Sequence, residues 1–449
     1  MTFDTPLYRG TKHNKLHWQF AVGVKTGRNQ YQLISSMKFI SNPEKLAVSS
    51  RSFPKASTKK GLQVNENYIS DAVSLGIKHT TYNMCLDDMI ALPSRRNTAQ
   101  GIAYSYDGAT YWFDRGVIES YDRTLNTYKR KNMIVSAIIL LRYRSDLTYL
   151  MPTPYYHNGF YGLKTSTSAA RKQLEAVFTF LAERYAADGR IANWIIGNEV
   201  NNFTTYHYTG YKTLSTNARL YTNAFRLAYI SIRSVYSKAR LYISLDHLWN
   251  TLLSTEHTSK GFLNAFAKYW NNYGNFNIAY HPYPSPLTAP EFWKNTNGAI
   301  SNSSNSACVN MGNISVLTNY VKNKFGSNTR IILSEQGFTS MKGSTEVQKA
   351  QAAAIAYAYY LAEFNDMIDA FILHRHIDHQ EELNQGLALG LWTRKPGTIE
   401  TAGTKKYVWS VYKYVDTPQG EKKTAFAIPI IGKGSWKMII PGYQPSRFS

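Results

Sequence analysis

The sequence predicts an α/β fold of the (β/α)₈ TIM-barrel class over residues 59–416. Short apolar runs alternate with stretches whose apolar residues recur at helical spacing, and the alternation closes after eight pairs. The run at 133–142 is apolar on both faces, as expected for a buried parallel strand. With 449 residues, 43% of them hydrophobic, the chain is large enough for one such barrel.

The predicted strands and helices follow one another along the chain. The strands are expected at 61–64, 77–83, 133–142, 191–200, 240–247, 275–281, 330–337 and 368–374. The helices are expected at 68–75, 118–130, 166–187, 215–238, 261–273, 316–325, 346–364 and 407–414. The helix at 166–187 has the clearest signal, because Leu174, Val177, Phe178 and Leu181 fall on one face and Gly189 follows.

Three segments lie outside this alternation. Residues 1–58 are predicted as a β-rich extension with strands at 16–24 and 31–40, either packed on the barrel or left from a larger module. Residues 84–115 are predicted as a long loop over the barrel mouth. Residues 417–449 are predicted as a tail packed on the barrel, with strand-like runs at 425–431 and 436–440.

The charge points to an anionic partner. The net charge of +22 and the pI near 9.6 are expected of a protein that binds an acidic or sulfated glycan. They are equally expected of a basic surface that is only solvated. The basic residues are scattered without a nucleic-acid motif, so no nucleic-acid partner is expected. The 34 tyrosines and 9 tryptophans are residue types that stack on sugar rings.

Other classes have little support in the sequence. No run of about 18 apolar residues is present, so no membrane span is expected. Two cysteines are too few for a disulfide framework or a cysteine metal site. We expect a monomer without a cofactor. The start of the sequence has no apolar leader segment, so the protein is either intracellular, or secreted or cell-surface after removal of a leader.

Two glutamates mark the candidate site. Glu199 and Glu335 each stand where an apolar strand-like run stops. The carboxyl ends of barrel strands build the active site in this fold. Two such carboxylates suit glycoside hydrolysis, in which one protonates the leaving oxygen and the other attacks or activates water. The alternative is that both only bind nearby loops.

The residues around these glutamates carry a family resemblance. Gly197-Asn198-Glu199, Ser334-Glu335-Gln336-Gly337 and His281-Pro282-Tyr283 resemble the active-site strands of the retaining glycoside hydrolases of clan A, which include cellulases, mannanases and galactanases. The resemblance implies that Glu199 is the acid/base and Glu335 the nucleophile. It also implies that Asn198 binds the sugar 2-hydroxyl, that Tyr283 hydrogen-bonds Glu335, and that His281 lines the site. A β-linked oligo- or polysaccharide is the implied substrate.

The sequence departs from that pattern in three places. Val200 follows the acid/base glutamate where proline is common, and Tyr82-Asn83 stands where an arginine is common, with Asn83 predicted to bind substrate there. The role of this missing arginine could be taken by Arg142, Arg144 or Arg375. Trp392 is the nearest candidate for the tryptophan platform, or it packs in a hairpin. These departures indicate a distant family.

A second constellation competes with the glutamates. His374, His376 and Asp378 share one side if the last strand continues through them, which is the spacing of a metal half-site. A metal-dependent barrel hydrolase is therefore an alternative, and a non-catalytic glycan-binding protein is another. Otherwise His374, Arg375 and His376 bind substrate at the rim. Asp246, His247 and Trp249, after the fifth strand, are predicted to bind substrate too.

Overall fold

The computed structural model describes residues 5–342 and 345–448, and eight parallel strands close into a barrel at its centre. Phe371 and Ile372 of the last strand pair with Lys60 and Gly61 of the first, which closes the ring. The predicted fold class is confirmed. The strands in chain order are β3 (Lys60–Leu62), β4 (His79–Cys85), β7 (Ile134–Leu140), β8 (Asn193–Ile196), β9 (Arg240–Leu245), β10 (Asn277–Tyr280), β11 (Ile331–Gln336) and β14 (Ile368–Leu373).

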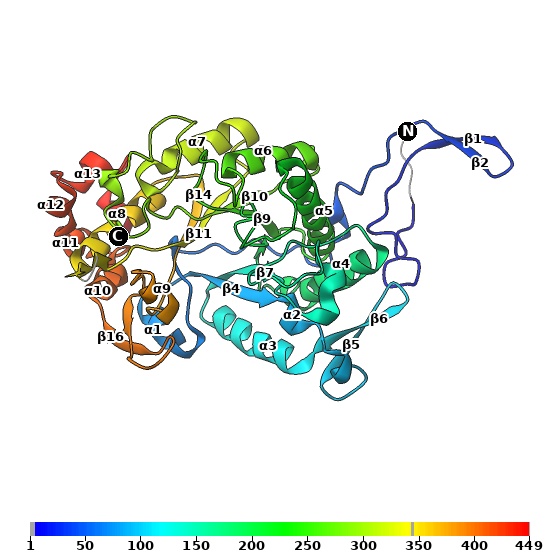
Figure 1. Cartoon of the computed structure of the whole chain (residues 1–449), viewed down its shortest axis with the longest axis horizontal. Coiled ribbons are helices and arrows are strands. Elements are labelled where there is room, and N and C mark those ends of the chain that lie inside the picture. Colours follow the sequence, from blue (N-terminus) through cyan, green and yellow to red (C-terminus); the bar gives the residue numbers. More distant parts are fainter. Residues whose placement is uncertain (1–4, 343–344, 449) are drawn as a thin grey trace.

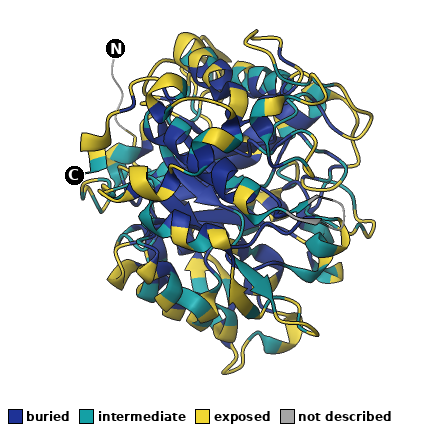
Figure 2. Cartoon of the chain, turned by 90° about the vertical axis from the view of Figure 1, so that its left-hand side faces the viewer, coloured by how far each residue is buried: buried dark blue, intermediate teal, exposed yellow. Residues whose placement is uncertain are grey.

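A helix follows each barrel strand and packs on the outside, so the strands are buried and the outward helix faces are exposed (Figures 1 and 2). Side-chain caps start several of them; for example, Thr167 accepts a hydrogen bond from the Ala170 amide. These helices are α1 (Ile69–Ser74), α3 (Arg115–Arg130), α4 (Ser168–Leu181, continued by a π-helical turn Ala182–Ala186), α5 (Leu214–Arg233), α6 (Ser259–Trp270), α7 (Ile314–Phe325), α8 (Gln348–Glu363) and α10 (Tyr407–Tyr414).

The remaining elements are short. The strands outside the barrel form hairpins: β1 (Gly23–Gly27) with β2 (Gln30–Leu33), β5 (Gly101–Tyr106) with β6 (Ala109–Asp114), β12 (Met341–Lys342) with β13 (Thr345–Glu346), and β15 (Trp392–Arg394) with β16 (Ala402–Lys405). The short α-helices are α2 (Leu86–Met89), α9 (Gln380–Asn384), α11 (Gly420–Thr424), α12 (Ala427–Ile431) and α13 (Trp436–Ile439). Short 3₁₀ helices are Pro43–Leu46, Glu66–Tyr68, Pro93–Arg95, Ser145–Leu150, Phe292–Lys294, Met311–Asn313 and Pro445–Phe448.

The barrel interior is a packed apolar core. Its side chains come from most of the strands, and a glycine is needed where two strands approach closely: a Cβ on Gly61 would lie 2.8 Å from Ile372 Cγ1. The core therefore fills the barrel and leaves the strand ends to hold functional side chains. The interior cluster consists of Ile138, Leu140, Ile195, Tyr242, Ala279, Ile332, Ala370 and Ile372.

The segment 84–115 is not a loop over the barrel mouth, so that prediction is wrong. The hairpin β5–β6 turns at Asp107-Gly108, both with positive φ, and packs along α4. Phe113 stacks on Phe180 at 3.9 Å between ring centroids, and the Tyr104 hydroxyl donates to Glu183 at 2.8 Å. The aromatic residues of this segment thus cover a helix outside the barrel.

The N-terminal segment forms an arm whose hairpin β1–β2 projects from the body (Figure 1). The strand predicted at 16–24 is largely wrong, since it overlaps β1 only at Gly23 and Val24, and the strand predicted at 31–40 ends at Leu33. The flanking chain leaves the hairpin and runs over the barrel helices. The Phe20 amide pairs with the Lys38 carbonyl at 2.8 Å at the base of the hairpin. Further on, the Ser49 amide donates to the Val235 carbonyl at 3.0 Å.

The C-terminal tail is helical, and the two strands predicted there are wrong. In α12 the buried residues Ala427 and Ile431 are four apart, and from α13 onward Trp436 and Ile440 are again four apart. This spacing is helical, although isoleucine favours strands. The Trp436 ring packs edge-on against Tyr360 of α8. In residues 5–342 and 345–448, no helix has the length and apolar composition needed to cross a membrane.

Candidate active site

Glu199 stands in a strained turn after β8. Its φ is +39°, a region that side-chain-bearing residues rarely adopt. Two contacts with Ser244 of β9 hold the turn: the Glu199 amide donates to its Oγ at 2.9 Å, and the Val200 amide donates to its carbonyl at 3.0 Å. The Glu199 side chain is therefore fixed at the mouth of the barrel with only 9% of the residue exposed.

Glu335 lies in β11, and residues from the end of β10 connect it to Glu199. The Tyr283 hydroxyl donates to Glu335 Oε1 at 2.9 Å. His281 Nδ1 lies 2.8 Å from Glu199 Oε1, and its Nε2 lies 3.1 Å from the hydroxyl of Ser334, the residue before Glu335. The three strand ends thus form one hydrogen-bonded unit.

The two glutamates have opposite electrostatic environments. Burial, reinforced by the charges of Asp246 and Glu335, raises the pKa of Glu199, although the hydrogen bond from His281 opposes this. Burial also acts to raise the pKa of Glu335, but His374, His281 and the Tyr283 hydroxyl outweigh it and lower that pKa. One carboxyl therefore favours the protonated form and the other the ionised form, as acid and nucleophile require.

Both glutamates open into one cavity of about 440 Å³. Six carboxyl groups line it in the described part of the chain, against one arginine and three histidines. One of the six, Glu256, has its pKa raised to about 9 by burial and by Asp246 beside it, so it is protonated at neutral pH. Its Oε2 atom is buried without a hydrogen-bond partner among the described residues. An acidic lining with free polar atoms suits a neutral, hydroxyl-rich ligand.

Several predicted residues reach this cavity. Asn198 lines it, and its buried Oδ1 has no partner among the described residues, so it is free to meet a ligand. His374 is fixed by Gln63 and by Glu382, the latter at 2.7 Å from Nε2, and Arg375 donates to the same Glu382 at 3.1 Å. The predicted residues lining the cavity are Asn198, Glu199, Asp246, His247, Tyr283, Glu335, His374 and Arg375.

Two predicted polar residues at earlier strands do not line the cavity. Asn83 is exposed at the end of β4. Arg142 turns to the acidic pair on α2, with Nε 2.9 Å from Asp87 Oδ2 and Nη2 2.5 Å from Asp88 Oδ2. Of the three arginines open for the place of the missing family arginine, Arg142 and Arg144 do not line the cavity, whereas Arg375 does.

Three predicted aromatic residues are structural. Trp249 is fully buried, and its indole N–H donates to the Ser304 carbonyl at 3.1 Å. His376 and Trp392 both hold Asp71 of α1, at 3.0 and 2.9 Å, so neither reaches the cavity. Because β14 ends at Leu373, strand alternation no longer sets the directions of the residues that follow.

The three residues of the predicted metal half-site do not face one another, because each lies in different surroundings. His374 faces the cavity, His376 binds Asp71, and Asp378 binds Lys406 at 2.7 Å. In the described ranges, no group of three or more histidine, cysteine, aspartate or glutamate residues is arranged to hold a metal ion.

Some cavity residues had no sequence signal. Tyr206 and Glu256 come from the loops after β8 and β9, and Glu382 comes from α9 after β14. Burial and the charges of Glu199 and Glu335 raise the pKa of Tyr206 to about 12, which reflects its place beside both glutamates. Loop residues carry no periodicity, so only the three-dimensional structure could assign them.

Changing Trp249 to Phe tests its structural role. The change removes one of two donors to the Ser304 carbonyl, which keeps Lys260 Nζ at 2.9 Å, and it leaves a void beside Tyr280. We therefore expect the free energy of unfolding to fall by about 1–3 kcal/mol. Chemical denaturation measures this. The matched control is Trp18→Phe, at a residue that is 50% exposed, where a change within about 0.5 kcal/mol is expected. Equal effects of the two substitutions would contradict the assignment.

Comparisons with known proteins agree with the fold. A family model described as "Family of unknown function (DUF5722)" matches residues 52–439. No curated protein matches the sequence. A family 39 glycoside hydrolase from the gut symbiont Bacteroides cellulosilyticus WH2 aligns over 88% of this chain and 69% of its own, at 13% identity and a TM-score of 0.52. A glucosidase from Croceicoccus marinus aligns over 82% of this chain and 68% of its own, at 12% identity and a TM-score of 0.50. At such identities the likeness establishes the barrel fold alone.

Proposed function

The chain belongs to the family of unknown function DUF5722, and we propose that it is a retaining glycoside hydrolase that cleaves a β-linked glycan. The observation that carries this proposal is the pair of strand-end glutamates, Glu199 and Glu335, in one cavity with oppositely shifted pKa values. The two solved structures above that share the barrel are described as a glycoside hydrolase and a glucosidase, which supports the coarser part of the proposal.

The proposed reaction has two steps. In the first, Glu335 attacks the anomeric carbon while Glu199 gives its proton to the leaving glycosidic oxygen, so the carbon–oxygen bond breaks and a glycosyl ester forms. In the second, Glu199 takes a proton from water, and the resulting hydroxide displaces Glu335 from the anomeric carbon. Asn198, with its free Oδ1, is proposed to accept a hydrogen bond from the sugar 2-hydroxyl.

The cavity charge narrows the proposed substrate. An anionic group at the reacting sugar would meet six carboxyl groups, of which Glu335 must be ionised to react. We therefore propose a neutral sugar next to the cleaved bond. The net charge of +22 then reflects contacts elsewhere on the molecule.

The proposal is tested by screening the purified full chain against aryl β-glycosides and a panel of polysaccharides, with release of the aryl group or of reducing ends as readout. We expect the wild type to turn over at least one of these substrates and Glu335→Gln to show no turnover. Binding of a glycan without turnover, with equal affinity in both proteins, would instead favour a non-catalytic glycan-binding protein. Loss of turnover with EDTA and its rescue by zinc would favour a metal-dependent hydrolase.

Changing Tyr283 to Phe tests how Glu335 is kept ionised. The substitution removes a hydrogen bond that favours the charged carboxylate, so the pKa of Glu335 rises. The acidic limb of the pH profile of kcat/KM should move to higher pH, and kcat should fall by roughly 10–100-fold, the effect of one hydrogen bond to a charged group. The pH profile on the best aryl glycoside measures both effects. An acidic limb that stays in place would contradict this role.

A further inference from the structure

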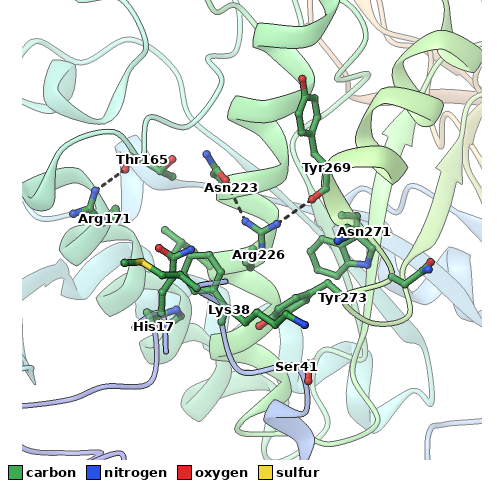
Figure 3. A pocket seen from close by; sticks show the side chains of 16 residues that line it. His17, Lys38, Ser41, Thr165, Arg171, Asn223, Arg226, Tyr269, Asn271 and Tyr273 are labelled. Atoms are coloured by element: carbon green, nitrogen blue, oxygen red, sulfur yellow. Dashed lines mark hydrogen bonds between the residues drawn. The ribbon is translucent and has the colours of Figure 1, made fainter. Parts of the chain in front are cut away.

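A second and larger cavity lies between the N-terminal arm and the outside of the barrel, with a volume of about 880 Å³ (Figure 3). Residues of the arm form one wall, and α5 together with the end of α6 forms the other. It shares no lining residue with the catalytic cavity. Three cationic side chains, Lys38, Arg171 and Arg226, line it, and in the described part of the chain no aspartate or glutamate does.

Arg226 of α5 is the central feature of this cavity. Its guanidinium lies 5.0 Å from the ring centroid of Phe39, 5.8 Å from Trp270 and 5.3 Å from Tyr273. Its hydrogen bonds go only to neutral acceptors, Asn223 Oδ1 at 3.2 Å and the Tyr269 carbonyl at 3.3 Å. The side chain is thus positioned by rings and amides.

This guanidinium has no negative partner among the described residues. Its Nε–H is buried without a hydrogen bond, and no salt bridge in those residues includes it. Burial lowers the pKa of Arg226, with only Tyr273 acting in the other direction. A partly buried charge is normally paired, because desolvation without a counter-charge is costly. The missing counter-charge is the clearest sign that this cavity takes an anion.

The other walls suit a sugar. Arg171 donates to the Thr165 carbonyl at 3.1 Å, and no salt bridge among the described residues includes its guanidinium. Burial, with the charges of Lys172 and Arg9, lowers the pKa of His17 to about 3, so its ring is neutral, and its buried Nδ1 is unpaired in the described residues. Asn271 and Asn272 add two amides, whereas the Tyr269 hydroxyl is bonded to Ser215 Oγ at 2.7 Å. Rings and amides beside a guanidinium fork match a saccharide that bears a planar or tetrahedral anion.

We propose that this cavity is a secondary carbohydrate-binding site, in which Arg226 pairs with a sulfate or carboxylate group of an anionic oligosaccharide. The site holds an anionic part of a glycan away from the carboxyl-lined catalytic cavity. Part of the excess positive charge of the chain would then bind an anion at this cavity. The proposal does not depend on the hydrolase activity, because binding is measured without turnover.

Isothermal titration of the full chain tests the proposal, with a carrageenan tetrasaccharide, its desulfated parent, an oligogalacturonate and sodium sulfate as separate probes. We expect at least one anionic oligosaccharide to bind, with affinity falling as salt rises. Arg226→Gln should weaken that binding by on the order of tenfold, the effect of losing a charge-assisted hydrogen bond. The matched control is Arg219→Gln, on the same helix but exposed and outside the cavity, which should bind like the wild type.

A second variant guards against misfolding of Arg226→Gln. Lys38 and Arg171 are exposed, so Lys38→Gln with Arg171→Gln keeps the fold and should also weaken binding. Binding of neither anionic oligosaccharide, equal binding of the desulfated parent, or equal affinity in Arg226→Gln and Arg219→Gln would each overturn the proposal. So would sodium sulfate binding as tightly as the tetrasaccharide, because the site would then recognise an ion and not a sugar.

Discussion

Changing Glu335 to Gln is expected to lower kcat by on the order of 10⁴-fold or more, because the amide cannot form the glycosyl ester on which both steps depend. The fold should be kept, since the amide has nearly the same shape and still accepts the hydrogen bond from Tyr283. Steady-state kinetics on the best aryl glycoside measure the effect, and thermal unfolding checks the fold.

A matched control separates this loss from a general loss of negative charge. Glu421→Gln removes the same charge at an exposed position on α11, away from the cavity, and should leave kcat unchanged. A Glu335→Gln protein that is folded and keeps activity comparable to this control would remove Glu335 from the reaction.

Changing Glu199 to Ala is expected to have an effect that depends on the leaving group. General acid catalysis contributes about 10²–10⁴-fold, so poor leaving groups should lose that factor. Dinitrophenyl glycosides need no proton and should form the glycosyl ester at a nearly normal rate. Added azide should then restore turnover, because azide attacks the ester without needing a base, and the product should be a β-glycosyl azide.

Two measurements check this role of Glu199. Rates across a series of aryl leaving groups should fall more steeply with leaving-group pKa than in the wild type. Mass spectrometry and NMR should identify the glycosyl azide. An equal loss on every leaving group, with no response to azide, would assign Glu199 a structural role in place of an acid/base one.

The barrel could be predicted from the sequence because its signals are local and repeated. Each strand is a short apolar run, each main helix has apolar residues at helical spacing, and a long series of such pairs leaves few alternative folds. The prediction fails in segments where the composition favours a strand but the spacing of the apolar residues favours a helix. At 425–431 the isoleucines favour a strand, but Ala427 and Ile431 pack on the same side, and tertiary packing decided the outcome.

The centre of the site could also be predicted, because strand position fixes where a side chain lies. Glu199, Tyr283 and Glu335 stand at or near strand ends and meet in one cavity. Beyond a strand end this reasoning fails. Trp249 and His376 both follow strands closely, yet both turn into the protein to satisfy Ser304 and Asp71.

The distribution of charge could not be read from the sequence. A net charge of +22 suggested an anionic substrate, but the folding of the chain gathers carboxyl groups at the barrel mouth. Lys38, Arg171 and Arg226, which form no salt bridge with the residues that the structure describes, line the cavity under the N-terminal arm instead. Composition gives the sum of the charges, and only the structure shows which of them face the same cavity.

The anomeric configuration of the first product tests the double-displacement mechanism most directly. Proton NMR of a β-glycoside during hydrolysis, recorded before mutarotation, should show the β-anomer first, because two displacements at the anomeric carbon restore its configuration. This corresponds to carboxyl groups about 5–5.5 Å apart, with the nucleophile in direct contact with the sugar. Appearance of the α-anomer first would mean a single displacement by water, and Glu335 would then be a base and not the nucleophile.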